Sequence, residues 1–262
     1  MLTYVYRFLI ELTNNRFVSN ALKKFAQSKY SSFIIPSFAS TYKINQDEME
    51  GTLDNYNTLH SFFIRKLKEG NRPVDQSLDS IVSPVDAVFE KHGLITEKNI
   101  IEVKAKPYSA REMLGDDNAL QKYIGGTFVL LYLSPSHYHR IHSPTTGVIT
   151  NQWTLGTKSY PVNKLGLKYG KDPLSKNYRT ITEVKQPGGQ HMAIVKVGAM
   201  FVNSIETTHK NEALSKGEEI AYFTFGSTVV LLFEKNSFQP LATLKEGTEV
   251  KVGEKIGTIK EQ

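Results

Sequence analysis

The sequence contains no cysteine and no long hydrophobic run. The first absence excludes disulfide bonds and thiolate metal sites, and it is typical of intracellular proteins. The second argues against a membrane-spanning helix, which needs about 18 or more consecutive apolar residues. Arg7 interrupts the apolar stretch at the N-terminus and no small-residue cleavage site follows it, so we expect no signal peptide.

Several binding motifs are also missing. The chain has no Walker loop, no GxGxxG loop, no EF-hand loop, and no internal repeat of about 20 to 50 residues. It also lacks a zinc finger and an RNP-type aromatic motif. We therefore look for function in scattered polar residues rather than in one contiguous signature.

Basic residues are concentrated at the N-terminus. The chain of 262 residues has a net charge of +6, and residues 1–30 hold five basic side chains against one acid, a local charge of +4. Such an excess favours nucleic acid or an anionic membrane surface as the partner. Because nucleic-acid-binding motifs are missing, we expect no nucleic acid and favour the membrane.

The N-terminal residues have an amphipathic pattern. Val5, Phe8, Leu9 and Leu12 fall on one face of a predicted helix, and a second helix is expected over roughly residues 17–25. A basic amphipathic helix with aromatic residues suits the membrane interface. A helix packed against its own domain is the alternative, and the sequence leaves it open.

The pattern changes from helical to β-type near residue 70. A breaker cluster at Gly70–Pro73 ends a polar, helical stretch, and short β-type runs follow from Ile81. We predict an α+β fold with a helical region at residues 1–70 and one β-rich domain of packed antiparallel or mixed sheets at residues 71–262. The expected strands are 87–90, 100–104, 127–133, 138–142, 147–154, 191–197 and 220–233, with a helix at 109–123 and a turn at 187–190.

The most informative stretch is Ile220–Phe233, which is almost entirely aliphatic, aromatic or β-branched and reads as a buried strand. Gly226 and Ser227 interrupt it. A glycine in such a run marks a bulge or a close backbone approach. The residues alone are compatible with a structural bulge and with a reactive serine at a strained turn.

Two further segments carry titratable side chains. His137, His139 and His142 are close together in the sequence; they could bind a metal, support strand ends, or act in acid–base chemistry. No acid sits close to them, so we expect no metal site. Asp86 follows Ser83-Pro84-Val85 and enters an apolar strand, where it is either a turn residue or a buried group that orients a histidine.

These segments together resemble the phosphatidylserine decarboxylase family. Phe225-Gly226-Ser227-Thr228 is similar to the family's L-G-S-T cleavage site, Tyr138–Pro144 to its Y-H-R-x-H-x-P motif, and Ser83–Asp86 to its S-P-x-D-G motif. Further similar segments are Phe62–Lys68, Gly70–Pro73, Lys104–Ser109, Tyr160–Asn163, Lys176–Arg179 and Val197–Ala199. Each is weak by itself, but the ordered set is specific. Phe225 replaces the family's leucine, and Ala87 replaces a glycine, which would be strained at a positive φ.

The resemblance implies a proenzyme that cleaves itself. His142, oriented by Asp86, would take the proton of Ser227, whose oxygen attacks the Gly226 carbonyl. Cleavage would give a β chain of residues 1–226 and an α chain of residues 227–262, which remain together as a heterodimer. Ser227 would become a pyruvoyl group, a covalent cofactor that forms a Schiff base with the substrate amine.

The reaction implied is the conversion of phosphatidylserine to phosphatidylethanolamine and CO2, with His139 as candidate proton donor. The substrate stays in an anionic membrane, so we expect a peripheral protein on the cytoplasmic face of the cell membrane. The sequence leaves the oligomeric state open, including a homo-oligomer.

Two other functions compete with this interpretation. The glycine-punctuated tail, residues 244–258, is similar to lipoyl or biotinyl carrier domains, although it lacks the hairpin that carries the modified lysine. A non-catalytic carrier or binding module is therefore one alternative. A hydrolase that uses Ser227, His142 and Asp86 on an external substrate is the other. Both predict one intact chain, and neither explains the ordered motifs.

Overall fold

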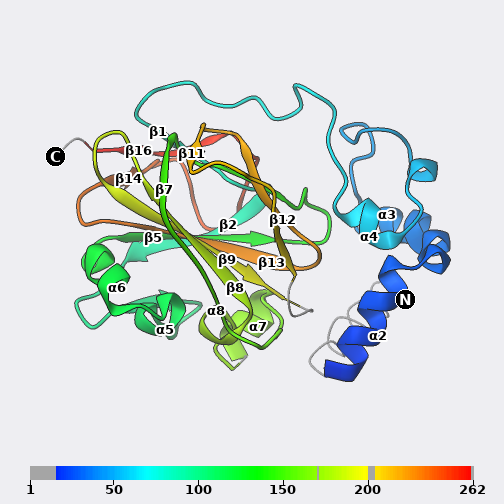
Figure 1. The fold of residues 1–262 in the computed structure, drawn as a ribbon, viewed down its shortest axis with the longest axis horizontal. Coiled ribbons are helices and arrows are strands. Elements are labelled where there is room, and N and C mark those ends of the chain that lie inside the picture. Colours follow the sequence, from blue (N-terminus) through cyan, green and yellow to red (C-terminus); the bar gives the residue numbers. More distant parts are fainter. Residues whose placement is uncertain (1–15, 170, 200–203, 261–262) are drawn as a thin grey trace.

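The computed structural model describes residues 16–169, 171–199 and 204–260 (Figure 1). The helices are α2 (Arg16–Gln27), η1 (Lys29–Ile34), α3 (Ile35–Thr41), η2 (Leu53–Asn55), α4 (Leu59–Phe63), α5 (Ala110–Leu114), α6 (Asp117–Tyr123), α7 (Lys164–Tyr169) and α8 (Pro173–Lys176). The strands are β1 (Ser80–Val82), β2 (Ala87–Leu94), β3 (Ile100–Val103), β4 (Lys106–Ser109), β5 (Thr127–Leu133), β6 (Arg140–His142), β7 (Gly147–Leu155), β8 (Arg179–Lys185), β9 (His191–Gly198), β10 (Ile205–Thr207), β11 (Ala213–Leu214), β12 (Glu219–Phe223), β13 (Ser227–Phe233), β14 (Phe238–Pro240), β15 (Thr248–Val250) and β16 (Lys255–Ile259).

The largest element is an eight-stranded antiparallel sheet in the order β11-β7-β8-β9-β13-β5-β2-β15. β13 lies inside this sheet between β5 and β9, and every one of its residues is buried. Its sequence, STVVLLF, suits a strand that is covered on both faces, because β-branched and aliphatic side chains pack well on a pleated surface. The sheet therefore holds Ser227 at the start of a central strand.

Two layers cover the sheet. On one face, the three-stranded sheets β10-β12-β6 and β1-β16-β14 enclose a core that includes Val229 and Leu231 of β13. On the other face, α5–α8 and the β3–β4 hairpin enclose a second core that includes Val230 and Leu232 (Figure 1). Alternate residues of β13 thus point into opposite cores, as the two-residue period of a strand requires.

The N-terminal helices form a third core at one side of the sheet (Figure 1). Phe38, Phe62 and Phe63 belong to this core, and so does Phe225 from the bend between β12 and β13. Helices as short as α3 and α4 depend on such packing, because isolated short helices are marginal in water. Phe225 therefore connects the helical region to the bend that precedes Ser227.

Two parts of the β-rich region repeat the same local structure. Ser83-Pro84 and Ser143-Pro144 both begin bends in which the serine hydroxyl donates to the carbonyl two residues later, at 2.6 Å each. The two bends are joined reciprocally: Val82 N–H donates to Pro144 O (3.0 Å) and His142 N–H donates to Pro84 O (2.8 Å). The Ser-Pro bends are therefore the two halves of one local two-fold unit.

The strands around these bends follow the same relation. β1 pairs with β16 as β6 pairs with β12, and β2 pairs with β15 as β7 pairs with β11. Ser83 exchanges backbone hydrogen bonds with the turn at Gly253-Glu254, and Ser143 does so with the turn at Gly217-Glu218. The carrier-like tail, which supplies β15, β16 and the turn at Gly253-Glu254, thus belongs to one half of this unit.

The α+β, β-rich fold class is confirmed, while several boundaries differ from expectation. The predicted strand 127–133 and the turn at 187–190 are confirmed. The predicted strand 220–233 is wrong as one element, because residues 224–226 form a bend between β12 and β13. The helix predicted over 109–123 divides where Gly115 adopts φ 61° and Asp116 caps α6. Strand β8 was not predicted.

Two further expectations concern the backbone at Ala87 and the N-terminal amphipathic face. Ala87 opens β2 and has no positive φ, so the expected strain is not found there. Val5, Phe8, Leu9 and Leu12 lie outside the described residues. Across the part of the chain that the structure describes, no helix is long and apolar enough to cross a membrane.

We expect Leu231→Ala to lower the free energy of unfolding by about 2 to 5 kcal/mol, because it leaves a cavity beside the middle of the central sheet. Leu78→Ala, at a leucine that is 99% exposed, is the matched control and should have little effect. Urea denaturation of both variants in a Ser227→Ala background, where we expect a single chain, measures the difference. Equal destabilisation would contradict the placement of β13 in the core.

Candidate active site

The candidate site is built around the bend that joins β12 to β13. Ser227 is fully buried, and its Oγ has no hydrogen-bond partner among the described residues. The Gly226 carbonyl group belongs to the peptide bond that precedes Ser227. Its oxygen accepts a hydrogen bond from Ala199 N–H at 2.8 Å. A backbone N–H in this position would stabilise negative charge that develops on the carbonyl oxygen.

Other hydroxyl groups near this bend are also buried without partners within the described segments. They belong to Ser204, Thr224 and Thr228. Thr224 N–H donates to Ser204 O (2.8 Å), which brings Ser204 to the bend. A Cβ placed on Gly198, which faces Ser227 across the β9–β13 ladder, would lie 2.1 Å from Ser204 Oγ. Buried unpaired hydroxyls are costly, and their accumulation here indicates a functional site.

His139 lies in the interior beside the bend. The Phe63 ring contacts both His139, at a tilt and with ring centroids 3.9 Å apart, and Phe225, on which it stacks with centroids 4.8 Å apart. His139 Nδ1 donates to the carbonyl of His137 at 2.8 Å, because a carbonyl can only accept. Nε2 has no partner among the described residues. Burial, together with the charges of Arg65 and His137, holds the pKa of His139 well below its usual value, so the imidazole is a neutral base.

His142 has the same tautomer. Its Nδ1 donates to Gly217 O at 2.8 Å, and the Tyr138 hydroxyl lies 3.3 Å from Nε2, where it can donate. Burial lowers the pKa of His142, and the Gly217 carbonyl and the charges of Glu219 and Asp86 partly oppose that shift. Nε2 is therefore available to accept a proton near neutral pH.

Asp86 lies on the bend that bonds to His142, but its carboxylate makes other contacts. Oδ1 accepts from Arg72 Nε (2.8 Å) and from Val252 N–H (2.9 Å), and Arg72 also reaches Oδ2. Among the described residues no direct hydrogen bond joins Asp86 to His142. The influence of Asp86 on His142 in this structure is through its charge and through the backbone bond from His142 N–H to Pro84 O.

The two-fold unit gives Asp86 a structural counterpart. Thr146 Oγ1 accepts from Lys216 N–H (3.2 Å) as Asp86 Oδ1 accepts from Val252 N–H. Asp86 Oδ1 therefore accepts from the turn at residue 252 in one half of the two-fold unit, as the neutral Thr146 hydroxyl accepts from the turn at residue 216 in the other half. The carboxylate charge and its Arg72 partner are the features that distinguish Asp86 from Thr146.

The three clustered histidines make separate contacts. His137 Nε2 pairs with Glu249 at 2.9 Å, while His139 and His142 make the separate contacts given above. No group of three or more potential metal ligands is found within residues 16–169, 171–199 and 204–260.

Lys196 is a polar residue of this region that the sequence analysis did not single out. It is fully buried in β9, opposite Val229, on the sheet face that Ser227 also occupies. Its Nζ donates to Thr182 Oγ1 at 2.6 Å. Burial lowers the pKa of Lys196 to about 7. The only signal in the sequence is its position between Val195 and Val197, within a strand of buried residues.

Comparison with known proteins identifies the family. The family model described as phosphatidylserine decarboxylase matches residues 59–258. The chain is 60% identical over 260 residues to the phosphatidylserine decarboxylase proenzyme of Geobacillus sp. strain WCH70, covering 99% of this chain and 100% of that protein. It is 59% identical over 254 residues to the proteins of the same name from Bacillus cereus strain ATCC 10987 and Bacillus anthracis strain CDC 684, covering 97% of each chain. The chain belongs to the phosphatidylserine decarboxylase family.

Family membership confirms the resemblance and disfavours both the carrier module and the serine hydrolase. The matched residues include Asp86, His139, His142 and Ser227. The two-fold unit that contains the carrier-like tail is thus part of a decarboxylase-family fold.

We expect the stability difference between Lys196→Met and its parent to depend on pH. The folded-state pKa of Lys196 is about 7 and the unfolded value is 10.5, so the unfolded chain binds more protons between these values. The parent should therefore gain stability relative to Lys196→Met by roughly 3 kcal/mol between pH 7 and pH 10, at 1.36 kcal/mol per pKa unit. Urea denaturation in the Ser227→Ala background measures this.

Lys210→Met, at an exposed lysine, is the matched control for loss of a positive charge. A difference between Lys196→Met and its parent that stays constant from pH 7 to pH 10 would contradict a buried lysine with a lowered pKa.

Proposed function

We propose that this protein is a self-processing decarboxylase that converts phosphatidylserine to phosphatidylethanolamine and CO2. The observation that carries the proposal is the nearly full-length similarity to phosphatidylserine decarboxylase proenzymes, together with a family match whose range includes Gly226 and Ser227. The word proenzyme in the relatives' names is consistent with cleavage of the chain. We place the cut between Gly226 and Ser227.

The first step of the proposed cleavage is an acyl shift. Ser227 Oγ attacks the Gly226 carbonyl carbon, and His142 Nε2 takes the hydroxyl proton and passes it to the Ser227 nitrogen as the amide bond breaks. Ala199 N–H stabilises the carbonyl oxygen during attack. The product is an ester that links Gly226 to the Ser227 side chain.

Removal of the Ser227 α-proton then expels the Gly226 carboxylate. One water molecule hydrolyses the remaining enamine and releases ammonia, which leaves a pyruvoyl group at residue 227. The surroundings fit such a group: Ser227 is fully buried between Leu133 and Gly198, and because Gly198 has no side chain, the Ser204 hydroxyl can approach the backbone there. A pyruvoyl carbonyl conjugated to an amide supplies an electron sink for loss of CO2 from an amino acid.

His139 is the proposed proton carrier of the decarboxylation. Its neutral tautomer presents Nε2 as an acceptor, so it cannot donate before it is protonated. The substrate arrives with an ammonium group, which must lose a proton before the nitrogen can react. We propose that His139 Nε2 takes this proton and returns it to the substrate Cα after CO2 has left.

The helical region is the proposed membrane-contacting surface. Tyr30 is 82% and Phe33 74% exposed, and Lys24 and Lys29 nearby are also exposed. Exposed aromatic rings beside basic side chains suit the interface of an anionic membrane. We propose a peripheral protein at the cytoplasmic face of the cell membrane, in which the two cleaved chains form the heterodimer.

We expect wild-type protein to give two chains on denaturing gels, with masses that place the cut after Gly226 and a small chain that is blocked at its N-terminus. Ser227→Ala and His142→Ala should give one chain, because the nucleophile or its base is missing. Intact-mass spectrometry measures the outcome. His139→Ala should still be cleaved but should lose most decarboxylation; failure to cleave would contradict the division of roles.

Asp86 requires a sharper test because it also completes a turn. Asp86→Thr copies the Thr146 side of the two-fold unit, so the backbone bond to residue 252 is retained while the charge is lost. Unfolding midpoints close to wild type together with an uncut chain would support the role of the carboxylate. Cleavage of Asp86→Thr at the wild-type rate would show that Asp86 only supports the turn.

We expect Tyr30→Ser/Phe33→Ser to bind phosphatidylserine vesicles at least about tenfold more weakly than wild type, because each ring loses apolar burial in the interface. Leu78→Ser is the matched control, since it removes an apolar side chain that is even more exposed, at 99%, outside the helical region. Vesicle sedimentation measures both. Equal binding by all three proteins would exclude these rings as membrane contacts.

A further inference from the structure

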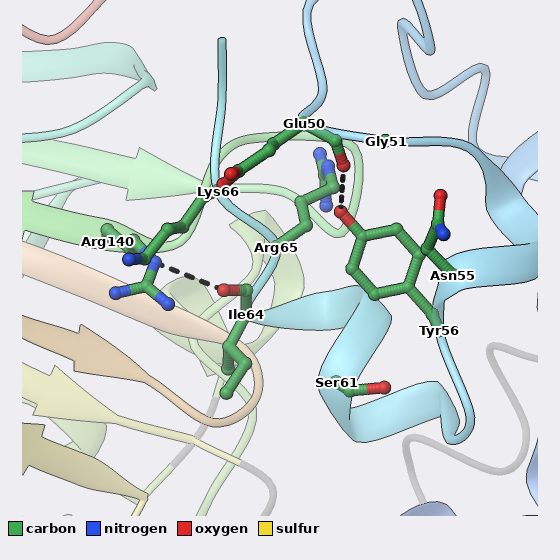
Figure 2. Close-up of a pocket in the computed structure, with 9 residues that line it drawn as sticks. All are labelled: Glu50, Gly51, Asn55, Tyr56, Ser61, Ile64, Arg65, Lys66 and Arg140. Carbon is green, nitrogen blue, oxygen red and sulfur yellow. Dashed lines mark hydrogen bonds between the residues drawn. The ribbon is translucent and has the colours of Figure 1, made fainter. Parts of the chain in front are cut away.

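A pocket with basic side chains in its wall lies between α4, the preceding loop and strand β6 (Figure 2). Its volume is about 520 Å³. Residues from well-separated parts of the sequence form its wall, and three of them are basic: Arg65, Lys66 and Arg140. Glu50 is the one acid in the wall; its backbone carbonyl accepts from the Tyr56 hydroxyl at 2.8 Å. Asn55 and Ser61 add further polar groups.

Arg65 is the unusual member of this wall. It is only 4% exposed, and its Nη2 donates to the carbonyls of Ser136 (2.9 Å) and His137 (3.1 Å). Nε and Nη1 have no hydrogen-bond partner, and no carboxylate forms an ion pair with Arg65, among the described residues. Burial lowers the pKa of Arg65 to about 10, which still leaves the guanidinium charged at neutral pH.

Two other arginines show that burial alone does not leave guanidinium N–H groups without hydrogen-bond partners. Arg179 is 3% exposed, yet its Nε, Nη1 and Nη2 all donate to backbone carbonyls. Arg140, in the same pocket, pairs with Glu219 at 2.8 Å and donates to Ile64 O. Arg65 alone of these three keeps a charged, desolvated group with unused donors.

A buried cation with unused donors is costly unless an anion accompanies it. The planar guanidinium fork matches carboxylate and phosphate oxygens in particular. The geometry points to an oxyanion site at Arg65, with Lys66 and Arg140 contributing positive potential. This inference rests on the proposed function, because phosphatidylserine carries both a carboxylate and a phosphodiester in its headgroup.

The site is next to the proposed reaction centre. The carbonyl oxygen of His137 accepts hydrogen bonds from both Arg65 Nη2 and His139 Nδ1. This shared oxygen connects the Arg65 guanidinium to the imidazole of His139, the proposed proton carrier. The Phe63 ring then links His139 to Phe225 at the bend. A headgroup oxyanion held by Arg65 would therefore be positioned by the same loop that fixes His139.

The test uses full-length protein and a short-chain, soluble phosphatidylserine. Arg65→Met should be cleaved normally and should raise the KM at least about tenfold, because the oxyanion loses its charged partner, and Arg65→Lys should restore part of the loss. Lys68→Met, at an exposed lysine outside the pocket wall, is the matched control and should keep the wild-type KM. Cleaved Arg65→Met with an unchanged KM would overturn the inference.

Thermal unfolding of the wild type with soluble probes separates the anion sources. Glycerophosphoethanolamine has a phosphodiester without a carboxylate, N-acetylserine has a carboxylate without a phosphate, and inorganic phosphate has no lipid headgroup. Specific binding should raise the unfolding midpoint of the wild type and of Lys68→Met, should raise that of Arg65→Lys by a smaller amount, and should leave that of Arg65→Met unchanged. If none of the three shifts the midpoint at millimolar concentration, the oxyanion site is excluded.

The two proposals fail in different ways. Cleaved wild-type protein that does not decarboxylate phosphatidylserine would overturn the proposed function, while the unfolding shifts would still decide whether Arg65 binds an oxyanion. Normal decarboxylation with no response to Arg65 substitution would overturn only the oxyanion site. If Arg65→Met does not fold, the KM of Arg65→Lys and the probe-induced midpoint shifts of the wild type decide whether Arg65 binds an oxyanion.

Discussion

The hydrogen bonds on both sides of β13 are the constraint on which the site depends. β13 pairs along its full length with β5 and β9, and this places Ser227 between Leu133 and Gly198. The Gly226 carbonyl is then held by Ala199 N–H. A peptide group held this firmly loses little further entropy when the neighbouring hydroxyl attacks it, which is the general benefit of positioning in intramolecular reactions.

The two interior histidines are set by backbone carbonyls rather than by acids. His139 donates to His137 O and His142 donates to Gly217 O, so each ring leaves Nε2 as its acceptor. Because burial lowers both pKa values, both rings are neutral bases before any reaction occurs. The His137 carbonyl that orients His139 also accepts from Arg65, so this loop connects His139 to the wall of the pocket.

The sequence predicts what depends on local pattern. Strand 127–133 is a continuous apolar run and agrees with β5, whereas residues 220–233 are as apolar as any strand and conceal the bend at 224–226. That bend depends on Ser204 and Ala199, which no local pattern reveals. β8 was missed because Thr180 and Thr182 make it look polar, although the layers bury both. The motif resemblance named Asp86 and His142 as candidates, but their contacts with Arg72 and Gly217 are tertiary and could not be predicted from it.

The arrangement of the strands limits how the two proposed chains could come apart. Of the strands after residue 226, β13 pairs with β5 and β9, β15 with β2, and β16 with β1, all from the longer segment. The shorter segment also supplies the turn at Gly253 for Ser83, while the longer one supplies the turn at Gly217 for Ser143. A cut at the bend would therefore sever the covalent link without creating a free subunit. Dissociation would require opening the central sheet from its middle, so the pieces would be interleaved and would unfold as one body.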